Sequence, residues 1–166
     1  MTEAGLIVDT ELPFSWEYGD SGSNQEHGNR LLLRVANLLD AHDAEPSKAS
    51  ERIEAKLDLM LYWLGSQMFG EATSQRMTPL RLSRDLIEWN DDDAIAKDEL
   101  IAMKIRIHPA IPGPLRLTGR ILESDQGRIR AIPVFQDGEQ EDAWDQWLFR
   151  LHRRAIQEAR LKAESA

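Results

Sequence analysis

Residues 101–121, IAMKIRIHPAIPGPLRLTGRI, decide the fold because two runs of alternating apolar and polar residues flank a proline-rich turn. In the first run, every second residue from Ile101 to Ile107 is large and apolar, and in the second run Leu115, Leu117, Gly119 and Ile121 alternate with polar residues. Successive side chains of a β-strand point to opposite faces, so each run predicts a half-exposed strand. The turn at 109–114 predicts that the two strands are neighbours.

Further strands are predicted on both sides of this pair. Downstream, the turn Asp125–Gly127 leads into an apolar run from Ile129 to Phe135, which is typical of a hairpin. Upstream, residues 78–89 are apolar and interrupted by turn residues, and the acidic loop 90–93 follows them. The segment 77–137 is therefore predicted to form a compact antiparallel β-domain.

Helical periodicity is found before and after this β-domain. Ile53, Leu57, Met60 and Leu64 follow a 4-3-4 spacing, which is a heptad seam. An earlier stripe begins near Asn29, so the segment 29–70 is predicted to be a helical hairpin. A third stripe predicts a C-terminal helix over 139–164. Residues 1–29 are expected to be irregular, with an apolar cluster at 12–16 that docks on the rest of the chain.

Composition and charge limit the classes of function. The 166 residues carry a net charge of −9 and no cysteine, and no apolar run approaches the ~18 residues that span a bilayer. A negative protein repels phosphate backbones, which disfavours DNA binding. The absence of cysteine removes disulfides and thiol chemistry. The acidic start has no signal-peptide character, so we expect a cytoplasmic protein that does not insert into membranes.

No motif for catalysis, a metal or a cofactor is found in the sequence. The four histidines are not spaced as metal ligands, and neither Ser83 nor Ser124 lies in a nucleophile elbow. The glycines are too dispersed for a phosphate-binding loop. We therefore expect a protein that is not an enzyme and that has no metal and no cofactor.

The heptad seam of the second helix allows two interpretations. Its residues either pack inside the chain's own core or form an interface between copies. The stretch from Leu57 to Leu64 is apolar around most of the helix, and a chain of this size has few other elements to cover it. We expect a dimer or tetramer whose interface contains Ile53, Leu57, Met60 and Leu64.

Basic residues are concentrated on the predicted strands. Residues 101–136 hold six basic and two acidic side chains, a net charge of +4 in a negative protein. The alternation places them on the solvent face of the sheet. They are either a solvated face paired with acids from elsewhere, or a site for a small phosphate ligand or an acidic partner.

Five segments, at 12–16, 52–64, 80–89, 114–121 and 144–154, together resemble the atypical, tetramer-forming branch of the PilZ domain family. Residues 80–89 (LRLSRDLIEW) resemble the strand–turn–strand of PilZ domains, and residues 114–121 resemble the apolar–Gly–Arg–apolar strand of the barrel. Residues 144–154, 12–16 and 52–64 resemble the terminal helix, the N-terminal segment and the inserted heptad helix. The resemblance implies an α+β fold: a PilZ-like antiparallel β-barrel, an inserted heptad helix pair and a C-terminal helix.

The resemblance also implies a cyclic di-GMP receptor with a degenerate ligand motif. Family members hold the ligand with two motifs, R-x-x-x-R and D/N-x-S-x-x-G. When the serine of the second motif is aligned with Ser83, Arg81 takes the place of the Asp or Asn acceptor and Leu86 takes the place of the glycine. We expect cyclic di-GMP to bind weakly or not at all. We also expect the chain to be a non-catalytic signalling protein that acts by oligomerisation and by contacts with an unidentified protein. The alternative is a structural adaptor without a nucleotide ligand. The candidate ligand-binding residues are Arg76, Arg81, Ser83, Arg84, Arg116 and Arg120.

Overall fold

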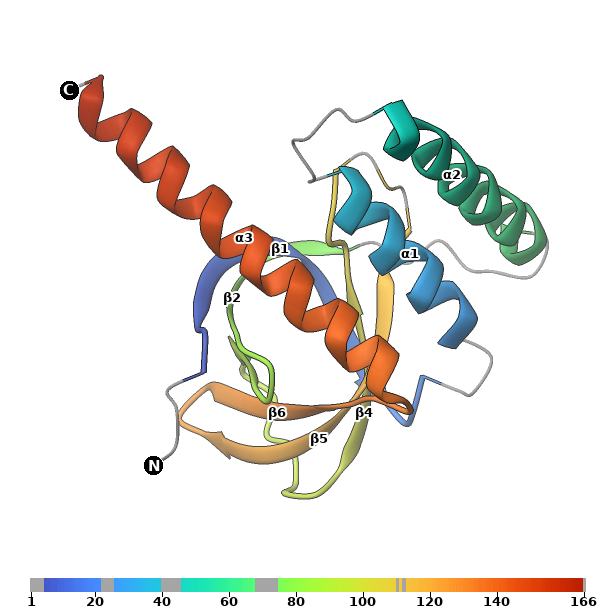
Figure 1. The fold of residues 1–166 in the computed structure, drawn as a ribbon. Coiled ribbons are helices and arrows are strands. Elements are labelled where there is room, and N and C mark those ends of the chain that lie inside the picture. The colour runs from blue at the N-terminus through green and yellow to red at the C-terminus, as the bar shows by residue number, and fades with distance from the viewer. Residues whose placement is uncertain are drawn as a thin grey trace.

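The computed structural model describes residues 5–21, 26–39, 46–67, 75–109, 111 and 113–165. Six strands close into an antiparallel barrel in the order β1-β2-β3-β6-β5-β4. The helices lie together on one side of this barrel (Figure 1). The elements in chain order are β1 (Val8–Tyr18), α1 (Glu26–Leu39), α2 (Pro46–Gln67), β2 (Arg76–Leu82), β3 (Ile87–Asn90), β4 (Leu100–Ile105), β5 (Leu115–Asp125), β6 (Arg128–Val134) and α3 (Gly138–Glu164).

The predicted fold class is confirmed: the chain is an α+β protein with a helix pair inserted into an antiparallel barrel and a C-terminal helix. β4 and β5, which carry the alternating sequence, pair from Leu100 opposite Arg120 to Ile105 opposite Leu115. The insertion lies between β1 and β2, so the barrel begins before the helix pair and is completed after it.

The prediction of irregular structure over residues 1–29 is wrong. Val8–Tyr18 is an eleven-residue strand that pairs with β2 through its first half and with β4 through its second half. The apolar cluster at 12–16 therefore belongs to the barrel wall, with Phe14 buried against Trp89 at a ring-centroid distance of 5.1 Å. Without β1 the sheet could not close between β2 and β4.

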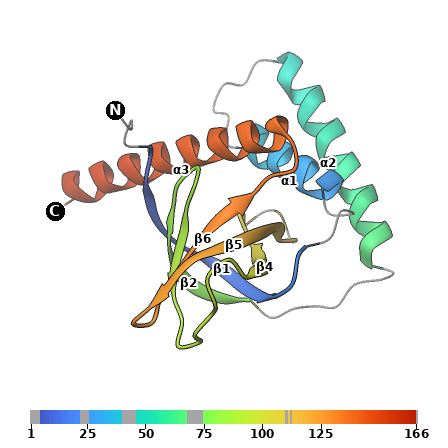
Figure 2. The same ribbon diagram turned by 90° about the horizontal axis from the view of Figure 1, so that it is seen from below.

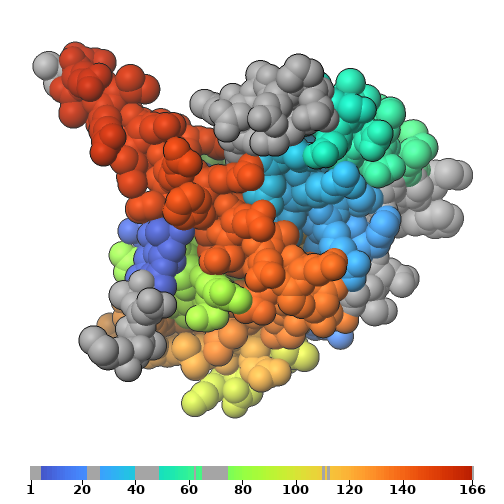
Figure 3. Space-filling model, viewed as in Figure 1, coloured from blue at the N-terminus to red at the C-terminus, as the bar shows by residue number. Residues whose placement is uncertain are grey.

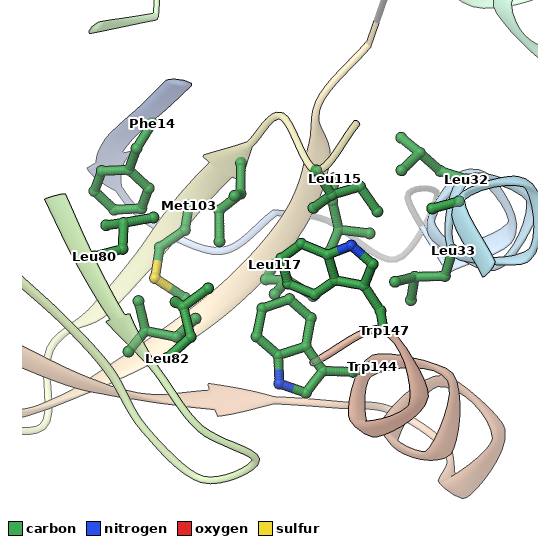
Figure 4. Packing of buried hydrophobic residues seen from close by; sticks show 14 of the residues in the cluster. Phe14, Leu32, Leu33, Leu80, Leu82, Met103, Leu115, Leu117, Trp144 and Trp147 are labelled. Carbon is green, nitrogen blue, oxygen red and sulfur yellow. The ribbon is translucent and has the colours of Figure 1, made fainter. Parts of the chain in front are cut away.

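The core joins the barrel interior to two tryptophans of α3. Figure 4 shows Trp144 and Trp147 pointing from α3 toward Leu115 and Leu117 of β5. Both indoles are fully buried and lie 5.0 Å apart between ring centroids. Figure 2 shows that α3 lies across the barrel and that its C-terminal part extends past the strands.

α1 connects the barrel to α2. The side chain of Asn29 is buried and forms two hydrogen bonds to the backbone of Arg116: the amide donates to the carbonyl, and the Arg116 N–H donates to Oδ1 at 2.9 Å. On the other side, α1 packs against α2, and the two helices run in opposite directions in Figure 1. The predicted hairpin over 29–70 corresponds to these helices, while 40–45 and 68–70 lie outside the described residues.

α2 also touches the loop before β5. A Cβ added at Gly113 would come within 2.2 Å of the Trp63 ring, so the indole lies directly on the glycine backbone. Only glycine permits this approach, which holds the C-terminal half of α2 close to the barrel. In the described residues, no helix is long and apolar enough to cross a lipid bilayer.

Candidate functional site

The turn between β2 and β3 is built around Ser83. Its backbone N–H donates to the carbonyl of Leu86 at 2.8 Å, and its hydroxyl accepts the Asp85 N–H at 3.3 Å. The Ser83 carbonyl accepts a hydrogen bond from the buried Trp144 indole at 3.2 Å. The turn is therefore fixed against α3, and the groups of Ser83 are largely occupied in holding it there.

Two candidate arginines flank this turn, and each is paired with a carboxylate. Arg81 Nε lies 2.8 Å from Asp9 Oδ1, and Arg84 Nε lies 3.0 Å from Glu141 Oε1. The hydrogen bond from each guanidinium to its carboxylate raises the pKa of Arg81 and of Arg84. Both side chains are exposed, so water weakens the pairs and either arginine can exchange its carboxylate for another anion at small cost.

A shallow hollow of about 320 Å³ lies beside the turn, on the outer face of β5 and β6. Arg120 and Glu141 line it together with the apolar residues Ile132, Pro133, Val134 and Phe135. Because Glu141 also pairs with Arg84, Arg84 lies close to the hollow that Arg120 lines. We name this region, comprising Arg81, Ser83, Arg84, Arg120 and Glu141, the turn surface.

The structure does not bring the other two candidate arginines to the turn surface. Arg76 begins β2, and five residues of extended strand, roughly 16 Å, separate it from Arg81. Arg116 lies near the start of β5, where its backbone is bound by Asn29 of α1. The predicted ligand residues therefore divide into one group at the turn and two separate positions.

Neighbouring basic residues of the sheet are engaged by groups from other segments. Arg130 lies between two carboxylates, 3.1 Å from Glu88 and 3.3 Å from Glu123, and Lys104 lies 3.2 Å from Glu17. Arg106 donates to the carbonyls of residues 109 and 111. For these residues the geometry favours the interpretation as a solvated, internally paired face.

The position that aligns with the glycine of the family motif has ordinary backbone geometry. In the described part of the chain, Asp98 and Gln126 are the non-glycine residues with positive φ, and Leu86 is not one of them. A half-buried leucine side chain therefore occupies the place where a glycine would let a ligand approach the backbone.

A second surface is formed by the four predicted interface residues of α2, which we name the α2 seam. Ile53, Leu57, Met60 and Leu64 are 61%, 53%, 58% and 65% exposed. The opposite face of α2, which carries the buried residues Ala55 and Leu59, packs against α1. The chain's own core therefore covers one face of α2 and leaves the seam in solvent.

The carboxylates that complete these sites are not predicted from the sequence. Asp9 lies on the unpredicted strand β1, and Glu141 lies in the first turn of α3. A signal for β1 was present, because Val8, Leu12 and Phe14 fall on one side of an alternating pattern. No local signal exists for Glu141 or for Asn29, whose partners lie 57 and 87 residues away. Among the described residues, no group of three or more His, Asp or Glu side chains could hold a metal ion.

Comparison with known proteins agrees with this geometry. A solved structure from Xanthomonas campestris, described as a tetrameric PilZ domain self-assembled via an unusual helical bundle, has a similar fold with a TM-score of 0.69. The two chains are 21% identical, and the match covers 92% of this chain and 91% of that chain. No curated protein sequence matches. Residues 32–161 match the family model described as atypical PilZ domain, cyclic di-GMP receptor, so the chain belongs to the atypical PilZ domain family.

Proposed function

We propose that the protein is a non-catalytic PilZ signalling protein of the cytoplasm that acts by self-assembly through the α2 seam. The observation that carries the proposal is the exposure of Ile53, Leu57, Met60 and Leu64, each more than half in solvent although they form a continuous heptad stripe. Large contiguous apolar patches on a soluble protein mark interaction sites.

Burial of the α2 seam between two copies favours their association. Burying one such side chain stabilises an assembly by about 1.5–3 kcal/mol, so four per copy outweigh much of the entropy lost on association. Heptad spacing lets identical helices interdigitate their side chains, which suits a symmetric dimer or tetramer. The Xanthomonas campestris structure supports this proposal because its description names assembly by a helical bundle.

The assembly is tested by the mass of a Leu57→Glu variant in light scattering at micromolar concentration. Burying a carboxylate in the seam costs several kcal/mol, so we expect this variant to be monomeric. Lys56→Glu is the matched control, because it introduces the same acid next to Leu57 at an exposed position outside the seam. Equal masses for the two variants would reject the α2 seam as the interface.

For the ligand, we propose that cyclic di-GMP binds weakly or not at all. The turn surface supplies Arg81, Arg84 and Arg120 as phosphate donors, but Leu86 replaces the glycine and Arg81 stands at the acceptor position. Each missing charge-assisted hydrogen bond costs about 1.5–3 kcal/mol, and 1.4 kcal/mol is tenfold in affinity. Loss of two such bonds weakens a micromolar site to about the millimolar range.

A calorimetric titration with cyclic di-GMP decides between a receptor and the alternative, a structural adaptor without a nucleotide ligand. We expect no binding, or a Kd above roughly 100 μM. Tight binding that is lost in Arg84→Ala but retained in Arg76→Ala would instead assign the turn surface as a working receptor site. In either case we propose that the output is contact with another protein.

A further inference from the structure

The last turns of α3 extend beyond the barrel, and no element that the structure describes packs on them. Every residue from Ala155 to Ser165 is exposed, and Figures 1 and 3 show this end of the helix projecting away from the molecule. Residues 149–166 carry five basic and two acidic side chains, a net charge of +3. The other 148 residues carry 15 basic and 27 acidic side chains, so the C-terminal part of α3 is a basic arm on an acidic protein.

One face of this arm combines apolar and cationic side chains. Phe149, Arg153, Ile156 and Arg160 are spaced 4-3-4 and therefore lie on one side of the helix, which we name the α3 stripe. Phe149 is 55% exposed and Ile156 is 40% exposed. Within the described residues, neither arginine of the stripe forms an ion pair, unlike Arg81 and Arg84 of the turn surface.

The helix dipole does not account for these cations. A basic residue in the last turn, such as Lys162, offsets the negative end of the dipole. Arg153 lies about three turns before the end of α3, where the dipole effect has faded. The α3 stripe has the composition of a contact surface instead, with apolar anchors alternating with groups that bind carboxylates.

A complementary surface exists on α2. Glu51, Glu54 and Asp58 are all exposed, form no ion pair in the described part of the chain, and lie along one side of the α2 seam. We name them the acidic edge. Glu51 and Asp58 are seven residues apart, as are Arg153 and Arg160, and seven residues of helix span about 10.5 Å. Two antiparallel helices can therefore place both arginines opposite both carboxylates.

We propose that the α3 stripe of one copy docks on the acidic edge of α2 in a second copy. Within one copy the two surfaces cannot meet, because α1 packs between α2 and α3, and the exposed end of α3 points away from α2 (Figure 1). α2 and the C-terminal end of α3 both project above the barrel in this view. The inference rests on the proposed function, because the seam supplies the assembly that the arm reinforces.

The experiment is a charge exchange followed by sedimentation velocity of the full chain. We expect Arg153→Glu/Arg160→Glu to weaken assembly about tenfold at low salt, since exposed ion pairs each contribute two- to fivefold and reversal adds repulsion. Glu51→Lys/Asp58→Lys should weaken it similarly, and the quadruple variant should recover most of the loss. Lys162→Glu is the matched control, because it reverses a charge on the opposite face of α3 and should change little. The differences should shrink at high salt.

The outcomes separate this inference from the proposed function. If both double variants assemble as strongly as the wild type, the docking of α3 is overturned. It is also overturned if the quadruple variant loses as much assembly affinity as the two double variants together. Both results leave the α2 seam in place. A Leu57→Glu variant that retains the mass of the wild-type assembly overturns both. Circular dichroism of each variant checks that the fold is intact.

Discussion

The barrel and α2 are both rich in large apolar residues, but they bury them to very different extents. In β5, Leu115, Leu117 and Ile121 are at most 1% exposed. In α2, only two apolar residues of the described side chains are buried, and the heptad seam is more than half exposed. The barrel is complete within one chain, whereas α2 is held by one face and leaves the other open.

This difference shows which apolar residues stabilise the monomer and which are available to a partner. A closed barrel has no free sheet edge, and α3 covers it with two tryptophans, so the barrel needs no second copy. α2 gains its position from α1 and from the contact of Trp63 with Gly113. Substitutions in the two regions should therefore change different measurements, the free energy of unfolding or the mass.

The largest expected loss of stability is at Trp144. Its indole is fully buried, packs against Trp147 and donates to the Ser83 carbonyl, so Trp144→Ala should lower the free energy of unfolding by about 3–5 kcal/mol. Urea denaturation in the Leu57→Glu background measures this without a contribution from assembly. Phe149→Ala, an exposed aromatic on the same helix, is the control and should cost under about 1 kcal/mol. Comparable losses would contradict the division of α3 into a buried and an exposed part.

The next largest loss of stability is expected at a buried residue of α2. Leu59 is 5% exposed and its neighbour Met60 is 58% exposed. In the same background, Leu59→Ala should destabilise the monomer by about 2–4 kcal/mol, whereas Met60→Ala should leave it nearly unchanged. If Met60→Ala were equally destabilising, the seam would be part of the monomer core.

A smaller loss of stability is expected where α1 connects α2 to the barrel. Asn29→Ala removes the side chain that satisfies both backbone groups of Arg116, which should cost about 1–3 kcal/mol in the same denaturation experiment. Asn37→Ala is the comparison, since its amide makes one hydrogen bond of 3.3 Å to the Ala143 carbonyl and should cost less. The reverse order would show that α1 is held mainly by α3 and not by the barrel.

The smallest effect is expected on the turn surface. Arg81→Ala breaks an exposed ion pair with Asp9 that water screens, so the midpoint of urea denaturation should stay nearly unchanged. A clear decrease of this midpoint would show that the pair fastens β1 to β2. An unchanged midpoint leaves Arg81 available to an anionic ligand.

The sequence predicted the elements whose pattern is local and periodic. The alternation around Ile105 and Leu117 identified β4 and β5, and the heptads identified α2 and α3. β1 was missed because Pro13 interrupts a pattern that otherwise alternates, and because its partners β2 and β4 lie far along the chain.

The candidate site was predictable only in part. The residues near Ser83 could be found because they form one short stretch, but their partners Asp9 and Glu141 are 72 and 57 residues away from the arginines they bind. Such pairs follow from the closure of the barrel and the path of α3, which no local pattern encodes. The exposure of the α2 seam likewise depends on how little of α2 the core covers.

The most direct test of the central claim is the mass of the wild-type protein by light scattering at micromolar concentration. The exposed α2 seam predicts a mass two or four times the 18.9 kDa of one chain, with a decrease on dilution. A mass of 18.9 kDa that does not change with concentration would contradict assembly through α2.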